Sequence, residues 1–188
     1  MSYAELYHRI YAAPLSDIRT FMLVLLFGWT VLTFLFGLGH QSARVWMIIN
    51  RALAVCSVLG ILFVTVLSRG NGATGVSLRL FHIPAEDWLA REYRRMLLMN
   101  VFLYLPLGLS LSNAWPTAWA LSRRTLYTAA GGIAVSLACE LLQFLLRRGT
   151  AEIDDLVTNT AGTLLGVFCI VLACGILRLI KHKKEHNE

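Results

Sequence analysis

The chain has 188 residues, of which 57% are hydrophobic and only 15% are charged, and its mean hydropathy is +0.63. A soluble domain usually carries about 25% charged residues, so this composition excludes an ordinary soluble domain and predicts an integral membrane protein. The net charge of +6 comes from basic residues at the ends of apolar runs rather than from a basic and aromatic face, so nucleic acid is not an expected partner.

Five apolar runs nearly free of charge follow one another along the chain. A helix rises about 1.5 Å per residue, so roughly 20 residues cross the hydrocarbon core of a bilayer. No stretch alternates over ten residues, which excludes the strands of a membrane β-barrel. The sequence predicts one all-α membrane domain over 1–188, a bundle of about five transmembrane helices with short loops, at approximately 21–38, 45–67, 96–111, 126–146 and 156–177.

The longest loop, 68–95, is the sizeable extramembrane piece. Its alternating residues 76–80 predict a short extended segment, and a helix from Ala85 is expected to run into the third span or to meet it at a bend. Five spans place this loop on the same side as the 147–155 loop. The Lys and Arg tally of nine on that side against eight on the other gives no bias that would fix the orientation.

Polar residues enter three of the apolar runs at helical spacing, which places each set on one helix face. The fourth span carries Ser136, Glu140, Gln143 and Arg147. The fifth carries Asp155, Asn159, Gly162 and Gly166. The third carries Asn100, Tyr104 and Gly108, beside Pro106, which should kink its helix.

A carboxylate inside a membrane costs about 2.5–3.5 kcal/mol on insertion scales, so Glu140 should face protein or water. We therefore expect the fourth and fifth helices to form an antiparallel hairpin with facing polar stripes, brought close by Gly162 and Gly166. Glu140 should share a hydrogen-bonded network with at least one of Arg147, Arg148 and Asp155. The result would be a polar pocket toward the membrane face that bears the 68–95 and 147–155 loops.

Plainer roles stay open for most of these residues. Asp154 or Asp155 can serve only as a cap of the fifth helix, and Gln143 and Asn159 can simply bridge helices. Arg147 and Arg148 can be ordinary interfacial anchors. Glu140 is the residue for which a purely structural role is least expected.

Two separated motifs resemble those of the VanZ-like family. The segment Asn100-Val-Phe-Leu-Tyr-Leu-Pro-Leu-Gly108 is similar to the family's N-x-x-x-F-x-P-x-G, with Tyr104 where phenylalanine is usual. A second set is similar to E-x-x-Q followed by an arginine and D-D-x-x-x-N-x-x-G-x-x-x-G; it comprises Glu140, Gln143, Arg148, Asp154, Asp155, Asn159, Gly162 and Gly166. The stretch Thr65–Arg69 resembles the end of the family's preceding span, so the resemblance covers 65–166.

The resemblance implies a multi-pass protein of the bacterial cell membrane, of the type linked to resistance to teicoplanin-like glycopeptide antibiotics. Three functions are weighed on this basis. The first is a non-catalytic envelope protein whose pocket binds a lipid head group, a lipid-linked precursor or a lipoglycopeptide, with arginines suited to phosphate or carboxylate. The second is an intramembrane enzyme with Glu140 or Asp155 as acid and base. The third is a small transporter.

No cofactor and no metal is expected. The predicted functional cluster consists of Asn100, Glu140, Gln143, Arg147, Arg148, Asp154, Asp155 and Asn159. The predicted supporting residues are Arg69, Tyr104, Pro106, Gly108, Ser136, Gly162 and Gly166.

Overall fold

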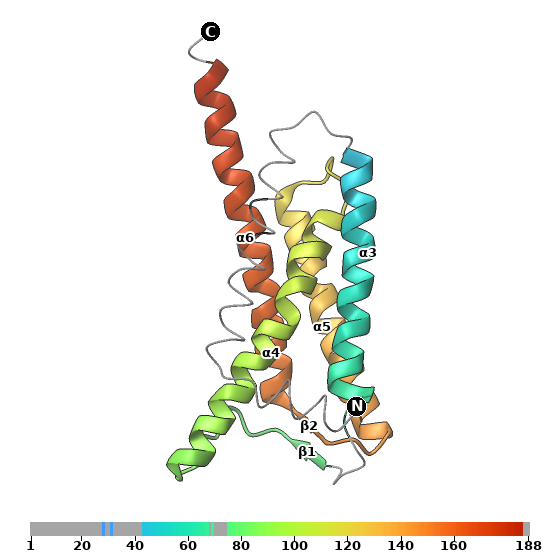
Figure 1. The fold of residues 1–188 in the computed structure, drawn as a ribbon, viewed down its shortest axis with the longest axis vertical. Helices are drawn as coiled ribbons and strands as arrows, with labels where there is room; N and C mark the ends of the chain where they lie inside the picture. The colour runs from blue at the N-terminus through green and yellow to red at the C-terminus, as the bar shows by residue number, and fades with distance from the viewer. Residues whose placement is uncertain (1–27, 29–30, 32–42, 68, 70–74, 186–188) are drawn as a thin grey trace.

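The computed structural model describes residues 28, 31, 43–67, 69 and 75–185, and this part of the chain is mainly helical (Figure 1). Four of its helices are long and apolar enough to cross a membrane. They are α3 (Ala43–Leu62) with its π-helical continuation η1 (Phe63–Leu67), α4 (Asp87–Ala114), α5 (Leu121–Leu145) and α6 (Ile153–Glu185). The all-α membrane bundle is confirmed, with four of the five expected spans found in the described residues. The remaining expected span, 21–38, falls almost wholly outside the described residues.

Helix α4 begins earlier and ends later than the apolar run 96–111. The helix expected from Ala85 runs into this span as one element of 28 residues, about 42 Å long at 1.5 Å per residue. This length exceeds the roughly 30 Å hydrocarbon core, so its charged first turns extend beyond the core. Pro106 lies within the helix, and the kink expected there stays a prediction.

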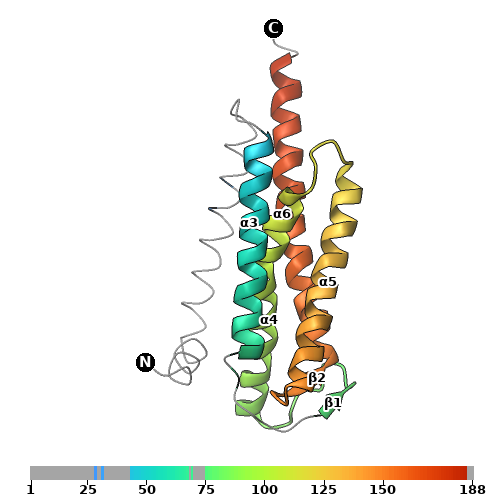
Figure 2. The ribbon, with the colours of Figure 1, turned by 90° about the vertical axis from the view of Figure 1, so that its right-hand side faces the viewer.

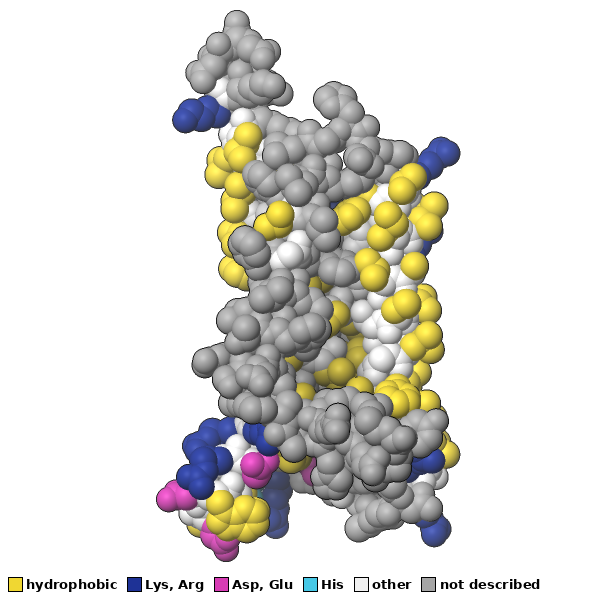
Figure 3. Space-filling model, in the orientation of Figure 1, with side chains coloured by type: hydrophobic (Ala, Val, Ile, Leu, Met, Phe, Trp, Pro, Cys, Tyr) yellow, Lys and Arg dark blue, Asp and Glu magenta, His cyan; other side chains and the backbone are white. Residues whose placement is uncertain are grey.

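The bundle is apolar on its outside and partly polar on its inside. Large apolar side chains are exposed along its length, including Leu59 (60%), Leu126 (67%) and Phe168 (60%), as the yellow surfaces in Figure 3 illustrate. Thr128 and Thr163 are fully buried instead. A water-soluble protein seldom exposes so much contiguous apolar surface, so this arrangement fits surroundings of lipid.

Close packing of α4 against α6 depends on three glycines. A Cβ on Gly162 would lie 2.1 Å from Val101 O, and one on Gly108 would lie 2.1 Å from Thr163 O. Gly166 similarly faces the α4 backbone. The expectation that Gly162 and Gly166 bring the last two helices together is therefore wrong, because both glycines face α4 rather than α5.

The contact between α5 and α6 uses another glycine. A Cβ on Gly132 of α5 would lie 2.4 Å from Thr163 Oγ1 of α6. Figures 1 and 2 show α5 and α6 joined by a short connection at the lower end of the bundle, as expected for a helical hairpin.

Two short strands join the loops at this lower end. β1 (Gly75–Ser77) pairs in parallel with β2 (Thr150–Glu152), in the register Gly75 with Thr150 and Ser77 with Glu152 (Figure 2). The extended segment is thus found at the start of the predicted stretch 76–80. The pairing also confirms that the 68–95 and 147–155 loops share one side.

Candidate functional site

The polar stripes of three helices meet in the lower half of the bundle. Asn159 Nδ2 of α6 donates to Ser136 Oγ of α5 at 2.9 Å, and Asn100 Nδ2 of α4 donates to Asp155 Oδ1 at 2.6 Å. All four residues occupy the faces that helical spacing assigned to them. The Asn159–Ser136 bond joins the facing polar stripes of α5 and α6, as the predicted hairpin requires, and the Asn100–Asp155 bond joins α6 to α4.

Glu140 lies in this interior and is only 9% exposed. Its Oε2 accepts the backbone N–H of Glu152 in β2 at 3.0 Å. Among the described residues, this main-chain donor takes the place of the hydrogen bond expected with Arg147, Arg148 or Asp155. The Glu140 carboxylate, near the C-terminal end of α5, therefore binds β2, the strand that precedes α6.

Gln143 and Arg148 bind the end of η1, where helical carbonyls lack intrahelical partners. Gln143 Nε2 donates to Thr65 O at 2.9 Å, and Arg148 Nη1 donates to Val66 O and Leu67 O, both at 2.9 Å. These bonds fasten α5 to the end of α3 and η1. The sequence did not predict that residues 65–67 are the partners of Gln143 and Arg148. The acceptors are backbone carbonyls, which every residue has, so the pattern of side chains does not reveal them.

Backbone geometry gives Arg147 and Arg148 different roles. Arg147 adopts φ +53°, a left-handed conformation typical of a helix C terminus, and its side chain is exposed. Arg148 follows this turn, and its N–H donates to Gln143 O at 2.9 Å. The turn thus directs Arg148 to η1 and leaves Arg147 at the surface.

We expect Arg148→Gln to lower the thermal stability of the purified protein and Arg147→Gln to leave it near the wild-type value. The Arg148 bonds to two carbonyls come from a charged donor, for which a loss of about 1–3 kcal/mol is typical. Thermal unfolding of both variants in one detergent checks this. Equal melting temperatures for the two variants would contradict it.

Asp154 ties the long loop to the bundle. Its Oδ1 accepts the backbone N–H of Phe81 at 2.8 Å, and its Oδ2 accepts the hydroxyl of Tyr93. The alternative that Asp154 serves only as a cap of α6 is too narrow, since its side chain also binds Phe81, a loop residue with φ +49°. Tyr93, in the part of α4 that precedes the apolar run, serves here as a hydrogen-bond donor.

The Nε of Arg69 is fully buried and has no hydrogen-bond partner in the part of the chain that the structure describes. Arg69 interacts electrostatically with Glu140, Glu152 and Asp155. Gly149 makes room for it: this glycine has φ +146°, and a Cβ there would lie 3.1 Å from Arg69 Nη1. A residue expected only to support the site thus supplies a positive charge that acts on three of its carboxylates.

The charge at this place is predominantly negative. Four carboxylates gather here, those of Glu140, Glu152, Asp154 and Asp155. Partial burial, then Asp155 and Asp154, raise the pKa of Glu152, which Arg69 lowers only in part. Glu152 therefore belongs to the site, although the sequence offered no periodicity that included it.

Deeper in the bundle the stripes continue as buried polar atoms. Tyr104 and Ser136 are both 0% exposed. The Tyr104 hydroxyl, Gln143 Oε1 and Asn159 Oδ1 have no hydrogen-bond partner in the described part of the chain. Within the same part, no group of three or more His, Cys, Asp or Glu side chains is arranged to hold a metal ion.

Comparison with known proteins adds the family. A sequence model described as VanZ/LLP1 matches residues 21–174, which includes the whole of α3, α4 and α5, most of α6 and every residue of the candidate site. No curated protein and no solved structure gave a match. The match extends on both sides of the stretch 65–166 in which the motifs resemble this family, and it covers most of the chain. Together with four apolar helices of spanning length, it shows that the chain is a membrane protein that belongs to the VanZ/LLP1 family.

Proposed function

We propose that this chain is a non-catalytic protein of the bacterial cell membrane that binds the polar head of a lipid-like molecule. The ligand classes are a lipid head group, a lipid-linked envelope precursor and a lipoglycopeptide. The binding site is the polar cluster, which we define as Arg69, Asn100, Glu140, Glu152, Asp154 and Asp155. The observation that carries the proposal is the buried Arg69 Nε, which has no hydrogen-bond partner among the described residues although Arg69 interacts electrostatically with Glu140, Glu152 and Asp155.

A buried polar group without a protein partner is unusual and calls for an external one. Arg148 and Gln143 are already bonded to the end of η1, and Arg147 is exposed. Of these three arginines, Arg69 is thus the one whose buried Nε has no partner among the described residues. A phosphate or carboxylate oxygen of the ligand would suit it, because guanidinium recognises both.

The excess of carboxylates over arginines in the polar cluster bears on the charge of the ligand's head group. Four acids against one guanidinium favour a ligand that also carries an ammonium group, because a bare anion would be repelled. A zwitterionic head, with its phosphate or carboxylate on Arg69 and its ammonium near Glu140 and Asp155, satisfies both charges. The polar cluster lies beside β1 and β2, at the end of the spans, where head groups of a bilayer are found.

The resistance to teicoplanin-type antibiotics implied by the family resemblance is part of this proposal. A lipoglycopeptide combines an apolar chain with a polar core, so it presents the same two features as a lipid with a large head group. A protein that binds such molecules at the membrane face would reduce their access to envelope precursors.

A second function, an intramembrane acid–base enzyme, is favoured by one observation. Asp155 interacts electrostatically with both Glu140 and Glu152, and a set of coupled carboxylates can hold a proton at neutral pH. In that case a bound lipid-linked substrate would be converted rather than retained. Product analysis distinguishes the two functions.

The test is lipid mass spectrometry on purified protein, comparing wild type, Glu140→Gln and the matched control Glu86→Gln. Glu86 is exposed and accepts Trp88 Nε1 at 2.8 Å, a bond that glutamine can keep. We expect wild type and Glu86→Gln to retain the same lipid, and Glu140→Gln to retain roughly a tenth as much or less, the effect of losing about 1.4 kcal/mol. Equal retention by all three proteins would contradict the proposal, and a cleaved product after incubation would favour the enzyme.

A further inference from the structure

A second concentration of charge lies at the opposite end of the bundle. There α3 begins, α4 ends and α5 begins, and we call this the α4–α5 end (Figure 1). Arg51 Nε donates to Ala114 O at 3.1 Å, and Arg124 donates through Nε and Nη2 to Ser112 O at 3.1 and 2.6 Å. Cations are favourable at the carbonyl end of a helix. Each guanidinium has five N–H donors, so both arginines are fixed in place with donors left for a further partner.

The described helices supply no acidic counterion at this end. No Asp or Glu occurs in residues 43–67 or 96–139, and α6 has none between Leu156 and Lys184. Acidic side chains on the face shown in Figure 3 lie at the lower end of the bundle. The positive charges of Arg51, Arg123 and Arg124 are therefore not balanced by the helices around them, and an external anion would be bound favourably.

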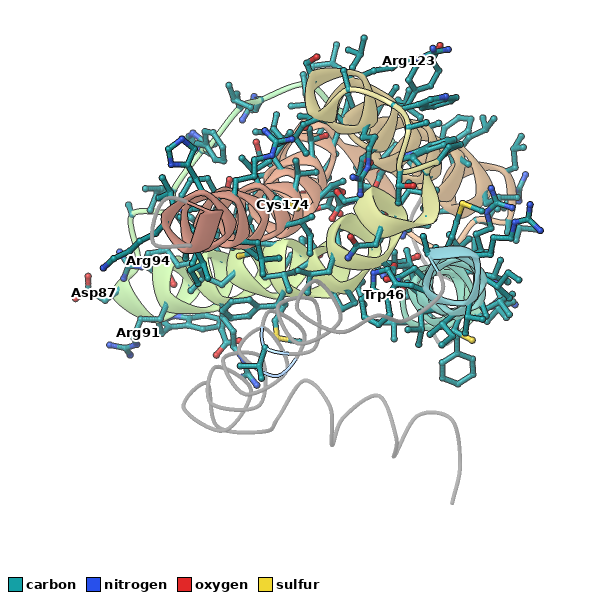
Figure 4. All side chains as sticks on the ribbon, turned by 90° about the horizontal axis from the view of Figure 1, so that it is seen from above. Trp46, Asp87, Arg91, Arg94, Arg123 and Cys174 are labelled. Atoms are coloured by element: carbon teal, nitrogen blue, oxygen red, sulfur yellow. The ribbon has the colours of Figure 1, made fainter. Side chains whose placement is uncertain are left out.

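Aromatic residues place these arginines at the level of the lipid head groups. Trp115 stacks on Trp119 with ring centroids 5.5 Å apart, and Tyr127 contacts both rings. The Arg123 guanidinium lies 4.0 Å from the centroid of Trp119, on the outer side of α5 (Figure 4). Trp and Tyr are enriched where a membrane protein crosses the interface between head groups and acyl chains. The α4–α5 end thus lies at a membrane surface.

An apolar groove runs from this level into the membrane. It has a volume of 320 Å³ and lies between α3, α4 and α5, with Val55, Val58, Leu111 and Gly131 among its lining residues. Val55 is 59% exposed, so the groove is open on the outside of the bundle. No water is available to fill such a groove inside the hydrocarbon core, so an acyl chain is its natural occupant.

The arginines and the groove lie on the same helix faces. Arg51, Val55 and Val58 follow one another at i, i+4 and i+7 on α3, and Arg124 and Gly131 are seven residues apart on α5. Seven residues correspond to about 10 Å along a helix. The arginines lie at the interface and the apolar groove lies about 10 Å deeper in the membrane. This separation suits a phospholipid, whose phosphate lies at the interface and whose acyl chain extends into the hydrocarbon core.

We propose that the α4–α5 end binds an anionic phospholipid, with its phosphate on Arg51 and Arg124 and one acyl chain in the groove. The donors that these arginines do not use on α4 bind the phosphate oxygens, and Arg123 contributes its charge at the rim. This site is separate from the polar cluster, because it lies at the other membrane face and has the opposite charge.

The test measures the thermal stability of the delipidated protein in detergent as phosphatidylglycerol or phosphatidylcholine with the same acyl chains is added. We expect phosphatidylglycerol to stabilise the wild type and phosphatidylcholine to do so much less. Arg51→Gln should weaken the apparent affinity for phosphatidylglycerol about tenfold, the loss of one charge-assisted bond. The control Arg91→Gln, an exposed arginine at the lower end, should have no effect.

Val55→Phe keeps the arginines and fills the groove from its open side. It should leave the melting temperature without lipid unchanged and reduce the stabilisation by phosphatidylglycerol. Equal stabilisation by both lipids would overturn the proposal, as would equal losses in Arg51→Gln and Arg91→Gln. Full stabilisation of Val55→Phe would overturn the assignment of the acyl chain to the groove.

Discussion

Gly162→Ala is expected to abolish most of the folded protein, although it adds a single methyl group. The new Cβ would lie 2.1 Å from Val101 O and 2.9 Å from Val101 C, both of which are backbone atoms that cannot rotate away. Helices α4 and α6 would have to separate along the face that also holds Gly108 and Gly166. Overpacking usually costs about 1–3 kcal/mol. Because the obstruction here is backbone, we expect a loss at or above the upper end of this range.

The matched control is Gly175→Ala on the same helix. A Cβ at Gly175 would have no heavy atom of another described segment within 4 Å. Gly175→Ala therefore brings the same gain in helix propensity as Gly162→Ala, but without a steric clash. Size-exclusion profiles and melting temperatures of both variants in detergent provide the measurement. A Gly162→Ala protein that is as abundant and as stable as Gly175→Ala would show that α4 and α6 do not pack through this glycine.

The spans were predictable because bilayer thickness sets the length of an apolar run. The ends of the helices were less predictable, because a helix stops where its terminal carbonyls and amides find other hydrogen-bond partners. Helix α4 thus begins at Asp87, well before the apolar run, and α5 ends at Leu145, just before the left-handed Arg147. Hydrophobicity placed the end of α5 within one residue, but it carries no information about the start of α4.

The sequence predicted which helix faces form the candidate site, but it did not predict the hydrogen-bond partners of the residues on them. Helical spacing correctly placed Glu140 and Asp155 in the interior. It could not show that Glu140 binds a main-chain N–H, because that donor depends on the pairing of β1 with β2 across about 75 residues of sequence. For the same reason Arg69 appeared peripheral, although the fold brings it among the carboxylates.

Arg69→Gln is expected to lower stability strongly at neutral pH and much less in acid. The Arg69 charge favours the ionised carboxylates of the polar cluster, so its contribution is present when they are ionised and is lost as they are protonated. Burial and the neighbouring acids raise the pKa of Glu152 above its ordinary value of 4.5. The contribution of Arg69 through Glu152 therefore declines as the pH falls through this raised pKa. Arg79→Gln, an exposed change in the same loop, is the control and should show no such dependence.

A second substitution tests whether the effect passes through Glu152. Because its pKa is raised in the folded protein, ionisation of Glu152 costs stability as the pH rises from 4.5 through the raised value. Glu152→Gln removes this cost, so it should raise the melting temperature at neutral pH and leave it nearly unchanged well below pH 4.5. The double variant Arg69→Gln/Glu152→Gln should recover part of the stability that Arg69→Gln loses, since the two side chains interact. Melting curves of the four proteins between about pH 3 and pH 8 measure this coupling. Strictly additive effects at every pH would mean that Arg69 and Glu152 act independently, and that Arg69 is not the counterion of the polar cluster.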